Sequence, residues 1–373
     1  MRILHTADWH LGKLFHGLHL TEDQALLFER ELVPLVRDFK PDVVLVAGDI
    51  FDRPIPPAEA VSLLSEILTR LHETGTKIIL LPGNHDSAER LAFARDLLSR
   101  LHIFVASSDT YLFEPLKISN TNFFLIPHLS PLELRELLKQ RGLLSEDTQE
   151  IRDLWETLLK SLPKGGERRI LSAHLFVEGG KKGDSETNLW VGGEEALPES
   201  LFSDFDLVLL GHLHRHQSPA ENVLYSGSLL PLSFSEVGQA KGVVLLEVSS
   251  QARPHREFIP LTPPREFLVV EEYFAELLHY PKTEAYVKAI LRDENPVPEA
   301  FERLRKVFPN LLALETPYLR GEGGELSSPE IDLCLDEREL FKAFLREITG
   351  RPPSSEETYL FEEGLNSLRH LST

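Results

Sequence analysis

At 373 residues, with 42% hydrophobic and 26% charged residues, the chain has the length and composition of a soluble protein of two or three domains, and its apolar runs are too short to span a membrane. Its formal net charge of −20 at pH 7 excludes a protein that binds nucleic acid through a generally positive surface, because such binding needs Lys and Arg to neutralise phosphates. The single cysteine, Cys334, excludes an internal disulfide and a thiolate metal cage, so a bound metal must take nitrogen and oxygen ligands.

Short runs rich in valine, isoleucine and leucine recur along the first 262 residues, with helix-like segments between them. Because the runs are continuously apolar, we expect strands that are buried on both faces. The runs are RILHTAD at 2–8, DVVLVAGD at 42–49, KIILLPGN at 77–84, NFFLIPH at 122–128, RRILSAH at 168–174, DLVLLGH at 206–212 and KGVVLLEV at 241–248. Strands that alternate with helices predict an α/β layered domain over residues 1–262.

Two of the segments between these runs carry clear helix signals. The segment 21–39, TEDQALLFERELVPLVRDF, opens with Thr21, which we expect to be its N-cap. The segment 56–75 begins with prolines and ends in glycine, which is the asymmetry expected of a helix.

Further parts follow the proline-rich stretch at 260–267, PLTPPREF, which predicts a domain boundary. Residues 285–315 have the pattern of a strand, a helix and a strand, so we expect a small α/β capping domain over 263–328. Apolar residues recur at helical spacing within 329–373, which predicts two short amphipathic C-terminal helices.

Polar side chains stand directly after five of the apolar runs, at the point where each predicted strand ends. They are Asp8 and His10, Asp49, Asn84 and His85, His174, and His212 and His214. Because ligands bind at the carboxyl ends of the strands in open α/β sheets, we expect these residues to meet at one sheet edge. Taken singly, Asp-x-His and Gly-Asp are better explained as a helix cap, a turn or a core histidine, whereas Gly-His-x-His and Gly-Asn-His-Asp are stronger indications of a site. To explain all of them structurally requires five coincidences at the same edge.

The residue types in this group indicate a metal site. Apart from His85, the group contains four histidines, two aspartates and one asparagine, a mixed nitrogen and oxygen donor set suited to Mn, Fe or Zn. Seven donors exceed the needs of one ion, whereas two ions bridged by one carboxylate would use them all. Such a pair hydrolyses phosphoesters with an activated water and without a protein nucleophile.

The order of these motifs, Asp-x-His, Gly-Asp, Gly-Asn-His-Asp, Ala-His and Gly-His-x-His, resembles the calcineurin-like metallophosphoesterase superfamily. The stretches HTADWHLGK, AGDIFDRPIPP, LPGNHDS, LGHLHRHQ and YSGSLLPLSFSE are similar to one branch of it, the nuclease subunits of bacterial SbcCD-type complexes. These are relatives of the eukaryotic double-strand-break resection nuclease. The resemblance implies a metal-dependent 3′–5′ double-strand exonuclease and single-strand or hairpin endonuclease that processes DNA ends together with an ATPase.

The resemblance also implies a role for each of these side chains. Two Mn²⁺ ions would be bound, although Mg²⁺, Fe²⁺ or Zn²⁺ would also suit the donors. The ligands would be Asp8, His10 and His214 on one ion, Asn84, His174 and His212 on the other, and Asp49 bridging the two. His85 would contact the scissile phosphate or protonate the leaving oxygen, with a supporting hydrogen-bond donor as the alternative.

Other residues near these motifs have roles that the sequence leaves open. Asp86 is expected to orient a histidine ligand or to cap the helix that begins at SAERL. Arg53 is either a phosphate contact or a surface charge, and Arg215 belongs to the few basic spots that could contact the DNA backbone. The other basic spots are Arg90, Lys164, Arg168, Arg169, Lys181 and Lys182.

The expected partners follow from the resemblance and from the composition. We expect DNA, an SbcC-like coiled-coil ATPase on which the C-terminal helices dock, and a second copy of the chain that packs through helices near 56–72 and 87–101. The C-terminal helices could equally pack on their own domain. The N-terminal stretch MRILHTADWH has a histidine and an aspartate where a signal peptide needs apolar residues, so we expect a cytoplasmic protein without a membrane contact.

Two other classes of function fit part of the pattern. A small-molecule phosphodiesterase or a phosphatase could use the same two ions, since a fold does not fix its substrate, but it would not need the hundred or so residues after 263. A non-catalytic binding scaffold is disfavoured because every ligand position is filled.

Overall fold

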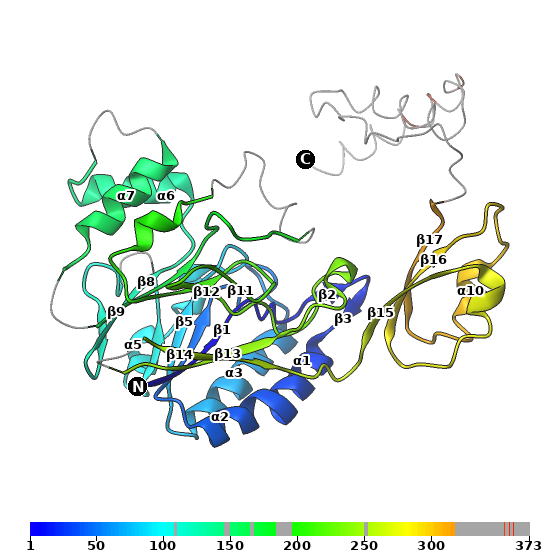
Figure 1. Ribbon diagram of the computed structural model, residues 1–373, viewed down its shortest axis with the longest axis horizontal. Coiled ribbons are helices and arrows are strands. Elements are labelled where there is room, and N and C mark those ends of the chain that lie inside the picture. Colours follow the sequence, from blue (N-terminus) through cyan, green and yellow to red (C-terminus); the bar gives the residue numbers. More distant parts are fainter. Residues whose placement is uncertain are drawn as a thin grey trace. The chain divides into compact units, whose positions relative to one another are not determined.

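The computed structural model describes residues 1–107, 110–144, 150–164, 168–183, 196–249 and 253–317, together with Ser354, Thr358 and Phe361 (Figure 1). The chain forms two compact units, Met1–Pro317 and Tyr318–Thr373. The C-terminal helices expected within 329–373 lie outside the described residues. The boundaries at 262 and 328 therefore stay predictions.

Two six-stranded sheets make up the larger part of the first unit. The first has the strand order β14-β13-β1-β4-β5-β6, with bounds β1 (Arg2–Thr6), β4 (Val43–Ala47), β5 (Lys77–Leu81), β6 (Ile103–Val105), β13 (Gly242–Glu247) and β14 (His255–Pro260). The second has the order β11-β12-β10-β9-β8-β7, with bounds β7 (Leu116–Ile118), β8 (Thr121–Ile126), β9 (Arg168–His174), β10 (Leu207–Gly211), β11 (Gln217–Ala220) and β12 (Val223–Tyr225). All seven apolar runs are strands, which confirms the α/β layered fold.

The two sheets are stacked face to face around a shared apolar core. In β4, Val43 and Leu45 point into this core, where they meet residues of the second sheet such as Ile170 and Leu209. Val44 points the opposite way, toward the helices. The expectation of a single sheet edge was therefore wrong, because a continuous apolar run does not reveal whether helices or a second sheet cover its second face.

Helices cover the outer face of each sheet (Figure 1). The first sheet packs against α1 (Thr21–Leu27), a π-helical turn η1 (Phe28–Leu32), α2 (Val33–Phe39) and α3 (Ala58–His72), and is followed by α4 (Ala88–Leu91) and α5 (Arg95–Ser99). The second packs against α6 (Pro131–Gln140), α7 (Ile151–Ser161) and the 3₁₀ turn η2 (Glu199–Phe202). Among the described residues, no helix combines the length and the apolar character needed to cross a bilayer.

The helix expected over 21–39 differs from the prediction at its start and in its middle. The N-cap position is Leu20 rather than Thr21, and no side chain caps the helix there. The reason is that Leu20 is fully buried, so its packing fixes the entry of the chain. The π-helical turn lies just before Pro34, which has no backbone N–H to continue an α-helical ladder.

A small three-stranded parallel sheet follows β14, and its part within 285–315 has the strand, helix and strand that the sequence predicted there. Its elements are β15 (Phe267–Glu272), α9 (Phe274–Leu277), β16 (Tyr286–Leu291), α10 (Ala300–Leu304) and β17 (Leu311–Glu315). It contacts the rest of the unit through an aromatic cluster in which Phe15 packs edge-on against Phe234 and Phe267 at 4.9 and 5.3 Å between ring centroids. Phe15 belongs to a short hairpin, β2 (Leu14–Phe15) and β3 (Leu18–His19), and Phe234 to the 3₁₀ turn η3 (Phe234–Glu236).

A polar contact reinforces this junction. The buried carboxylate of Asp23 on α1 lies 3.0 Å from a guanidinium nitrogen of Arg265 and accepts a short hydrogen bond from the Tyr286 hydroxyl. Asp23 thus connects α1 to the small sheet through Arg265 and Tyr286.

Candidate di-metal site

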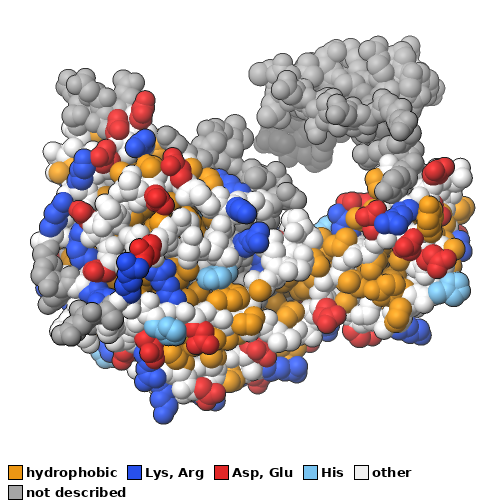
Figure 2. Space-filling view, in the orientation of Figure 1, with side chains coloured by type: hydrophobic (Ala, Val, Ile, Leu, Met, Phe, Trp, Pro, Cys, Tyr) orange, Lys and Arg blue, Asp and Glu red, His pale blue; other side chains and the backbone are white. Residues whose placement is uncertain are grey.

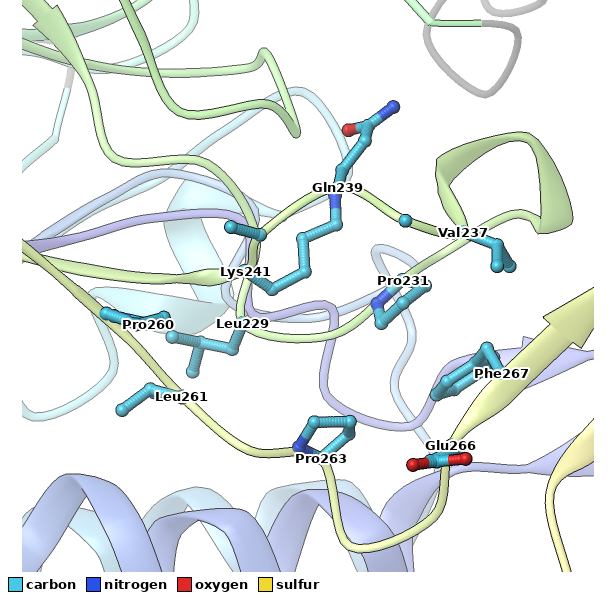
Figure 3. Close-up of a pocket in the computed structure, with 12 residues that line it drawn as sticks. Leu229, Pro231, Val237, Gln239, Lys241, Pro260, Leu261, Pro263, Glu266 and Phe267 are labelled. Carbon is cyan, nitrogen blue, oxygen red and sulfur yellow. The ribbon is translucent and has the colours of Figure 1, made fainter.

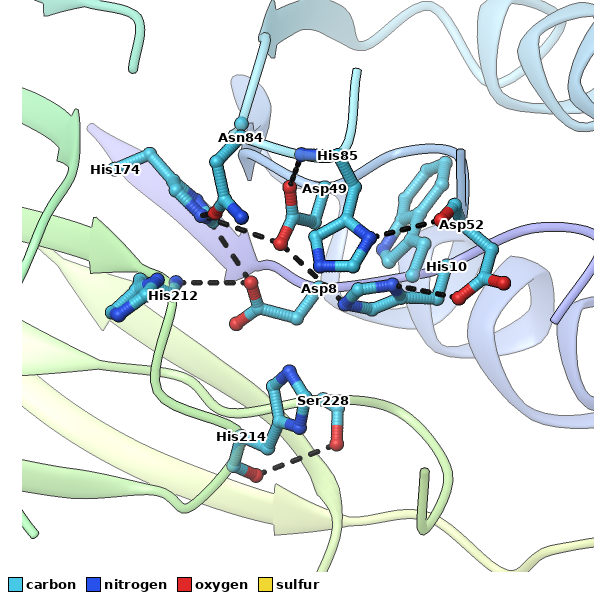
Figure 4. A network of polar contacts seen from close by, with 12 residues as sticks. Asp8, His10, Asp49, Asp52, Asn84, His85, His174, His212, His214 and Ser228 are labelled. Carbon is cyan, nitrogen blue, oxygen red and sulfur yellow. Dashed lines mark hydrogen bonds and ion pairs between the residues drawn. The ribbon is translucent and has the colours of Figure 1, made fainter. Parts of the chain in front are cut away.

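The loops after β1, β4, β5, β9 and β10 converge at one place, with three strands from the first sheet and two from the second (Figure 4). Four of the polar residues in these loops have a left-handed backbone although none is glycine, with φ of 52° at Asp8, 44° at His10, 47° at Asp49 and 100° at His212. Such conformations cost about 1–3 kcal/mol each and persist only where the surrounding structure enforces them. The backbone is therefore strained at the candidate ligands themselves.

Two glycines in these motifs are needed because side chains pass directly over them. A Cβ atom at Gly48, where φ is +94°, would lie 1.9 Å from Nδ1 of His174. A Cβ atom at Gly83 would lie 2.2 Å from Oδ1 of Asp49. The glycines before Asp49 and Asn84 thus give these side chains the room in which they meet.

All seven ligand candidates come together at these strand ends. One group consists of Asp8, His10 and His214, whose donor atoms lie within 4.8 Å of one another. A second group, Asp8, Asp49 and His174, is equally tight. Asn84 and His212 adjoin the second group.

The second group is tied together by short contacts. Nε2 of His174 lies 2.9 Å from Oδ1 of Asn84 and 3.3 Å from Oδ2 of Asp49. The same Asp49 oxygen lies 3.5 Å from Nε2 of His10, which belongs to the first group. The His212 ring packs 5.3 Å from that of His174, and its backbone N–H donates to Asp8. One oxygen of Asp49 thus stands between the two groups.

The donor set fits divalent cations. Asp8 is fully buried, and its Oδ2 atom has no hydrogen-bond partner in the described part of the chain. Leaving an ionised carboxylate buried without a partner is costly, so a bound cation would relieve this cost. Imidazole, carboxylate and amide donors together suit metals of intermediate hardness.

Burial and the two carboxylates set the protonation of this group. Burial lowers the pKa of His10 to about 4, and Asp52 and Asp49 offset only part of that effect. Burial also favours a lower pKa for His174, but Asp49 and Asp8 outweigh it and raise that pKa to about 10. Burial raises the pKa of Asp8, whereas His174 holds that of Asp49 well below its usual range despite burial. A metal and a proton would therefore compete for His174.

His85 lies beside these two groups and forms a third with His10 and Asp52. Its backbone N–H donates to Oδ1 of Asp49 at 2.8 Å, and its Nδ1 lies 2.9 Å from the carbonyl oxygen of Asp52. Its ring packs edge-on against that of His10 at 4.7 Å between centroids (Figure 4). The side chain is therefore held next to the candidate metal ligands with Nε2 left for another contact.

Sequence reasoning assigned no role to two acids that contact candidate ligands. Asp52 Oδ1 lies 3.3 Å from Nδ1 of His10 and 3.0 Å from Nζ of Lys13. Glu236 Oε1 lies 3.0 Å from Nδ1 of His214. Asp52 follows the Gly-Asp motif and Glu236 ends the stretch YSGSLLPLSFSE, so both stood in quoted motifs, but no spacing rule links either acid to its histidine.

Neither role expected for Asp86 is correct. Its carboxylate accepts backbone N–H groups of Ile50, Phe51 and Gly83 at 3.0, 2.8 and 2.9 Å. The cap of α4 is instead Ser87, whose hydroxyl accepts from the backbone of the third residue after it. Burial and the charge of Asp49 raise the pKa of Asp86 to about 7 against the effect of its three N–H donors. Asp86 thus links its own loop to the loop that contains Asp49.

Some of the arginines expected to contact phosphate or DNA are exposed, and one is buried. Arg53 and Arg215 are both exposed, and within the described residues neither side chain forms a hydrogen bond or ion pair. Arg169 is buried between the rings of Phe124 and Phe205, so it does not offer its charge to a ligand. A phosphate role for Arg53 and Arg215 stays a prediction.

Comparison with known proteins agrees with this geometry. Residues 1–216 match the family described as calcineurin-like phosphoesterase, and residues 263–349 match the Type 5 capsule protein repressor C-terminal domain, SbcD_C. The chain is 31% identical over 375 residues to the SbcD subunit of the nuclease SbcCD from Staphylococcus saprophyticus, in a match that covers 99% of this chain and 98% of the relative.

Solved structures show only a distant likeness. A dimetal phosphatase from Danio rerio is 15% identical and covers 70% of this chain and 99% of its own, with a TM-score of 0.39. The protein TT1561 of Thermus thermophilus is 16% identical with the same coverage and a TM-score of 0.38.

The layered fold and the cluster of histidines and aspartates at the strand ends define a calcineurin-like phosphoesterase. Because the identity to a known nuclease extends over nearly the whole of both chains, the chain belongs to the SbcD family, the nuclease subunits of SbcCD complexes. The resemblance seen in the motifs and the expected enzyme class are thereby confirmed.

The steric role of Gly48 leads to a testable expectation. Gly48→Ala should lower the free energy of unfolding by more than the about 1–2 kcal/mol expected of an alanine with a left-handed backbone, because its Cβ atom would also displace His174. The same substitution should abolish Mn²⁺ binding at His174. Gly75→Ala is the matched control, since Gly75 has φ of +81° and open space around its Cβ position. Urea unfolding in chelator and Mn²⁺ titration would measure both effects. Equal losses for the two variants would contradict the steric explanation.

Proposed function

We propose that this chain is the nuclease subunit of an SbcCD-type complex and hydrolyses phosphodiester bonds of DNA with the help of two Mn²⁺ ions. The observation that carries the proposal is the place of Asp49 Oδ2, 3.5 Å from Nε2 of His10 and 3.3 Å from Nε2 of His174. When bound, two such metal ions neutralise phosphate charge and lower the pKa of a bound water.

We assign one ion to each of the two groups of side chains. The assignment is Asp8, His10 and His214 for one ion, Asn84, His174 and His212 for the other, and Asp49 for both. Asp8 also lies within reach of the second group, so its carboxylate can support either ion. Buried carboxylates and largely buried imidazoles exclude bulk water from this place and fix its shape before substrate arrives.

His85 is proposed as the residue that acts on the phosphate. The carbonyl oxygen of Asp52 can only accept, so Nδ1 of His85 carries the hydrogen and Nε2 faces the substrate. From there Nε2 can bind a phosphate oxygen or transfer a proton to the leaving oxygen. The hydrogen bond from the His85 backbone N–H to Asp49 keeps the His85 ring close to the Asp49 carboxylate.

DNA affinity has to come from local contacts, because the chain is acidic. On the face that Figure 2 shows, Lys and Arg side chains are interspersed with Asp and Glu. We propose that exposed basic residues such as Arg215 and Arg90 contact the DNA backbone, and that the small sheet acts as a DNA-contacting cap. Binding by the chain alone should therefore be weak and salt-dependent.

The partners follow from the family. The match of residues 263–349 to a C-terminal domain of this family supports a function for the part that follows the phosphoesterase fold. We propose that residues 329–373 dock on an SbcC-like coiled-coil ATPase in the cytoplasm. With that partner the enzyme would act as a 3′–5′ double-strand exonuclease and a single-strand or hairpin endonuclease.

A small-molecule phosphodiesterase or phosphatase is the alternative on the same site. It would need Arg53 to grip a phosphate monoester, and this guanidinium is exposed and not engaged elsewhere in the described residues. The alternative leaves the whole of residues 263–349 without a purpose, which is why the nuclease is preferred.

We propose a homodimer because the segments expected to form its contact, 56–72 and 87–101, carry exposed apolar side chains. Phe93 and Leu97, on either side of the start of α5, are 82% and 64% exposed, and Val61 on α3 is 48% exposed. Exposed large apolar side chains that are close in the chain, as Phe93 and Leu97 are, support a protein contact there.

The central experiment compares substrates. The purified chain should cleave linear duplex DNA with Mn²⁺ and not with chelator, and should turn over a small aryl phosphomonoester little under the same conditions. Monoester turnover without DNA cleavage would instead favour the phosphatase and make Arg53 the next residue to test.

Two substitutions separate metal binding from chemistry. His85→Ala should bind both Mn²⁺ equivalents but lose about 10²–10⁴-fold in DNA cleavage, because only a proton donor or phosphate contact is removed. Asp49→Ala should lose metal as well, and the exposed His255→Ala should change neither. Elemental analysis and cleavage rates measure the two effects. Metal depletion in the His85 variant would show that His85 is a ligand.

The proposed dimer can be tested by placing a charge on the apolar surface around Phe93. Phe93→Glu should shift the mass seen by light scattering from two chains to one, because a charge would be buried in an apolar contact. Leu132→Glu is the control, since Leu132 is 66% exposed on α6 under the other sheet. A native chain that is already monomeric at working concentration would contradict the proposal.

A further inference from the structure

The turn η3 brings a buried acid to the metal site from outside the ligand motifs. Glu236, the last residue of this turn, is only 1% exposed. Its carboxylate contacts Nδ1 of His214 at 3.0 Å, Nζ of Lys241 at 2.6 Å and the backbone N–H of Leu232 at 3.2 Å. The ionised carboxylate can only accept, so Nδ1 of His214 must donate.

Lys241 completes a clamp around the same histidine. It is 5% exposed, and its ammonium group donates to the backbone carbonyl of His214 at 2.8 Å as well as to Glu236. The backbone N–H of Ser228 donates to that carbonyl at 3.1 Å. His214 is thus held both at its ring and at its backbone.

This arrangement determines which ring nitrogen faces the metal site. With Nδ1 committed to Glu236, Nε2 is the nitrogen that can join Asp8 and His10, whose ring lies 5.2 Å from that of His214. A hydrogen bond from the far nitrogen to a carboxylate is the usual way in which a metal-binding histidine is oriented. A buried ion pair contributes little to stability by itself, so a positional role explains it better than a stabilising one.

The turn itself is anchored on its other side. Phe234, two residues before Glu236, packs in the aromatic cluster with Phe15, which belongs to the hairpin that follows His10. Figure 3 shows Lys241 on the wall of a cavity lined also by Pro231 and Leu261, so apolar side chains lie close to it. The carboxylate therefore sits on a fixed support.

We propose that Glu236 is a positioning residue that fixes the His214 ring so that Nε2 faces Asp8 and His10. The proposal rests on the proposed function only in that His214 is a metal ligand. Glu236 itself touches neither the metal nor the substrate.

Two double variants of the full-length chain isolate this contact. Glu236→Leu with Lys241→Met replaces the ion pair by apolar side chains of similar size, which buried sites usually tolerate. Glu236→Gln with Lys241→Met has the same net charge and the same loss of the lysine, but its amide oxygen can still accept from Nδ1 of His214. The pair therefore differs chiefly in the acceptor for that one hydrogen. The readout is Mn²⁺ titration of metal-free protein, with free Mn²⁺ followed by its electron paramagnetic resonance signal.

The Leu/Met variant should bind one of the two Mn²⁺ equivalents about 10–100-fold more weakly, whereas the Gln/Met variant should retain both at near-native affinity. Equal Mn²⁺ affinity in the two variants would overturn the proposal. A native chain that fails to bind two equivalents would instead overturn the di-metal site itself, so the two failures are distinguishable.

Lys241→Met alone provides an independent test if the Leu/Met variant does not fold. It keeps the carboxylate of Glu236 on His214, so both Mn²⁺ equivalents should bind with near-native affinity. Loss of one equivalent in this variant would show that the ammonium group, and not Glu236, orients the histidine.

Discussion

Two buried carboxylates of like charge, Asp8 and Asp49, stand side by side at the ends of neighbouring strands, and the rest of the site is arranged around them. Like charges in a buried place repel, so the pair persists only beside groups that can compensate it. That compensation comes from the second sheet, where His174 lies 3.3 Å from Asp49 and the backbone of His212 donates to Asp8. The stacking of the two sheets is therefore a condition for the charge arrangement as well as for the core.

The strained loops are held by hydrogen bonds that reach from one strand end to the next. Asp86 binds three backbone N–H groups in two loops, and Asp49 accepts from the backbone of His85. These contacts keep left-handed residues such as Asp49 in place, and glycines at 48 and 83 leave room for the crossing side chains. Hydrogen bonds within the chain thus fix the ligand geometry, which lowers the reorganisation that metal binding requires.

A common rule governs the histidines. Nδ1 of four of them contacts a protein oxygen: a carboxylate for His10 and His214, and a backbone carbonyl for His85 and His174. In each case Nε2 is the nitrogen left for the metal site or the substrate. The supporting oxygens come from distant parts of the chain, and one of them, Glu236, belongs to a turn that also packs on the small sheet through Phe234.

The sequence by itself determined the strands, the order of the motifs and the family, because apolar runs and side chains at their ends are local patterns that the chain displays directly. It also identified the ligand candidates, since each of them follows an apolar run directly. Only the tertiary structure decided that two sheets share the site, that Asp86 joins two loops, and that Glu236 reaches His214 across 22 positions. Those relations depend on how separate segments pack, and a residue far along the chain leaves no periodic signal of the partner it will contact.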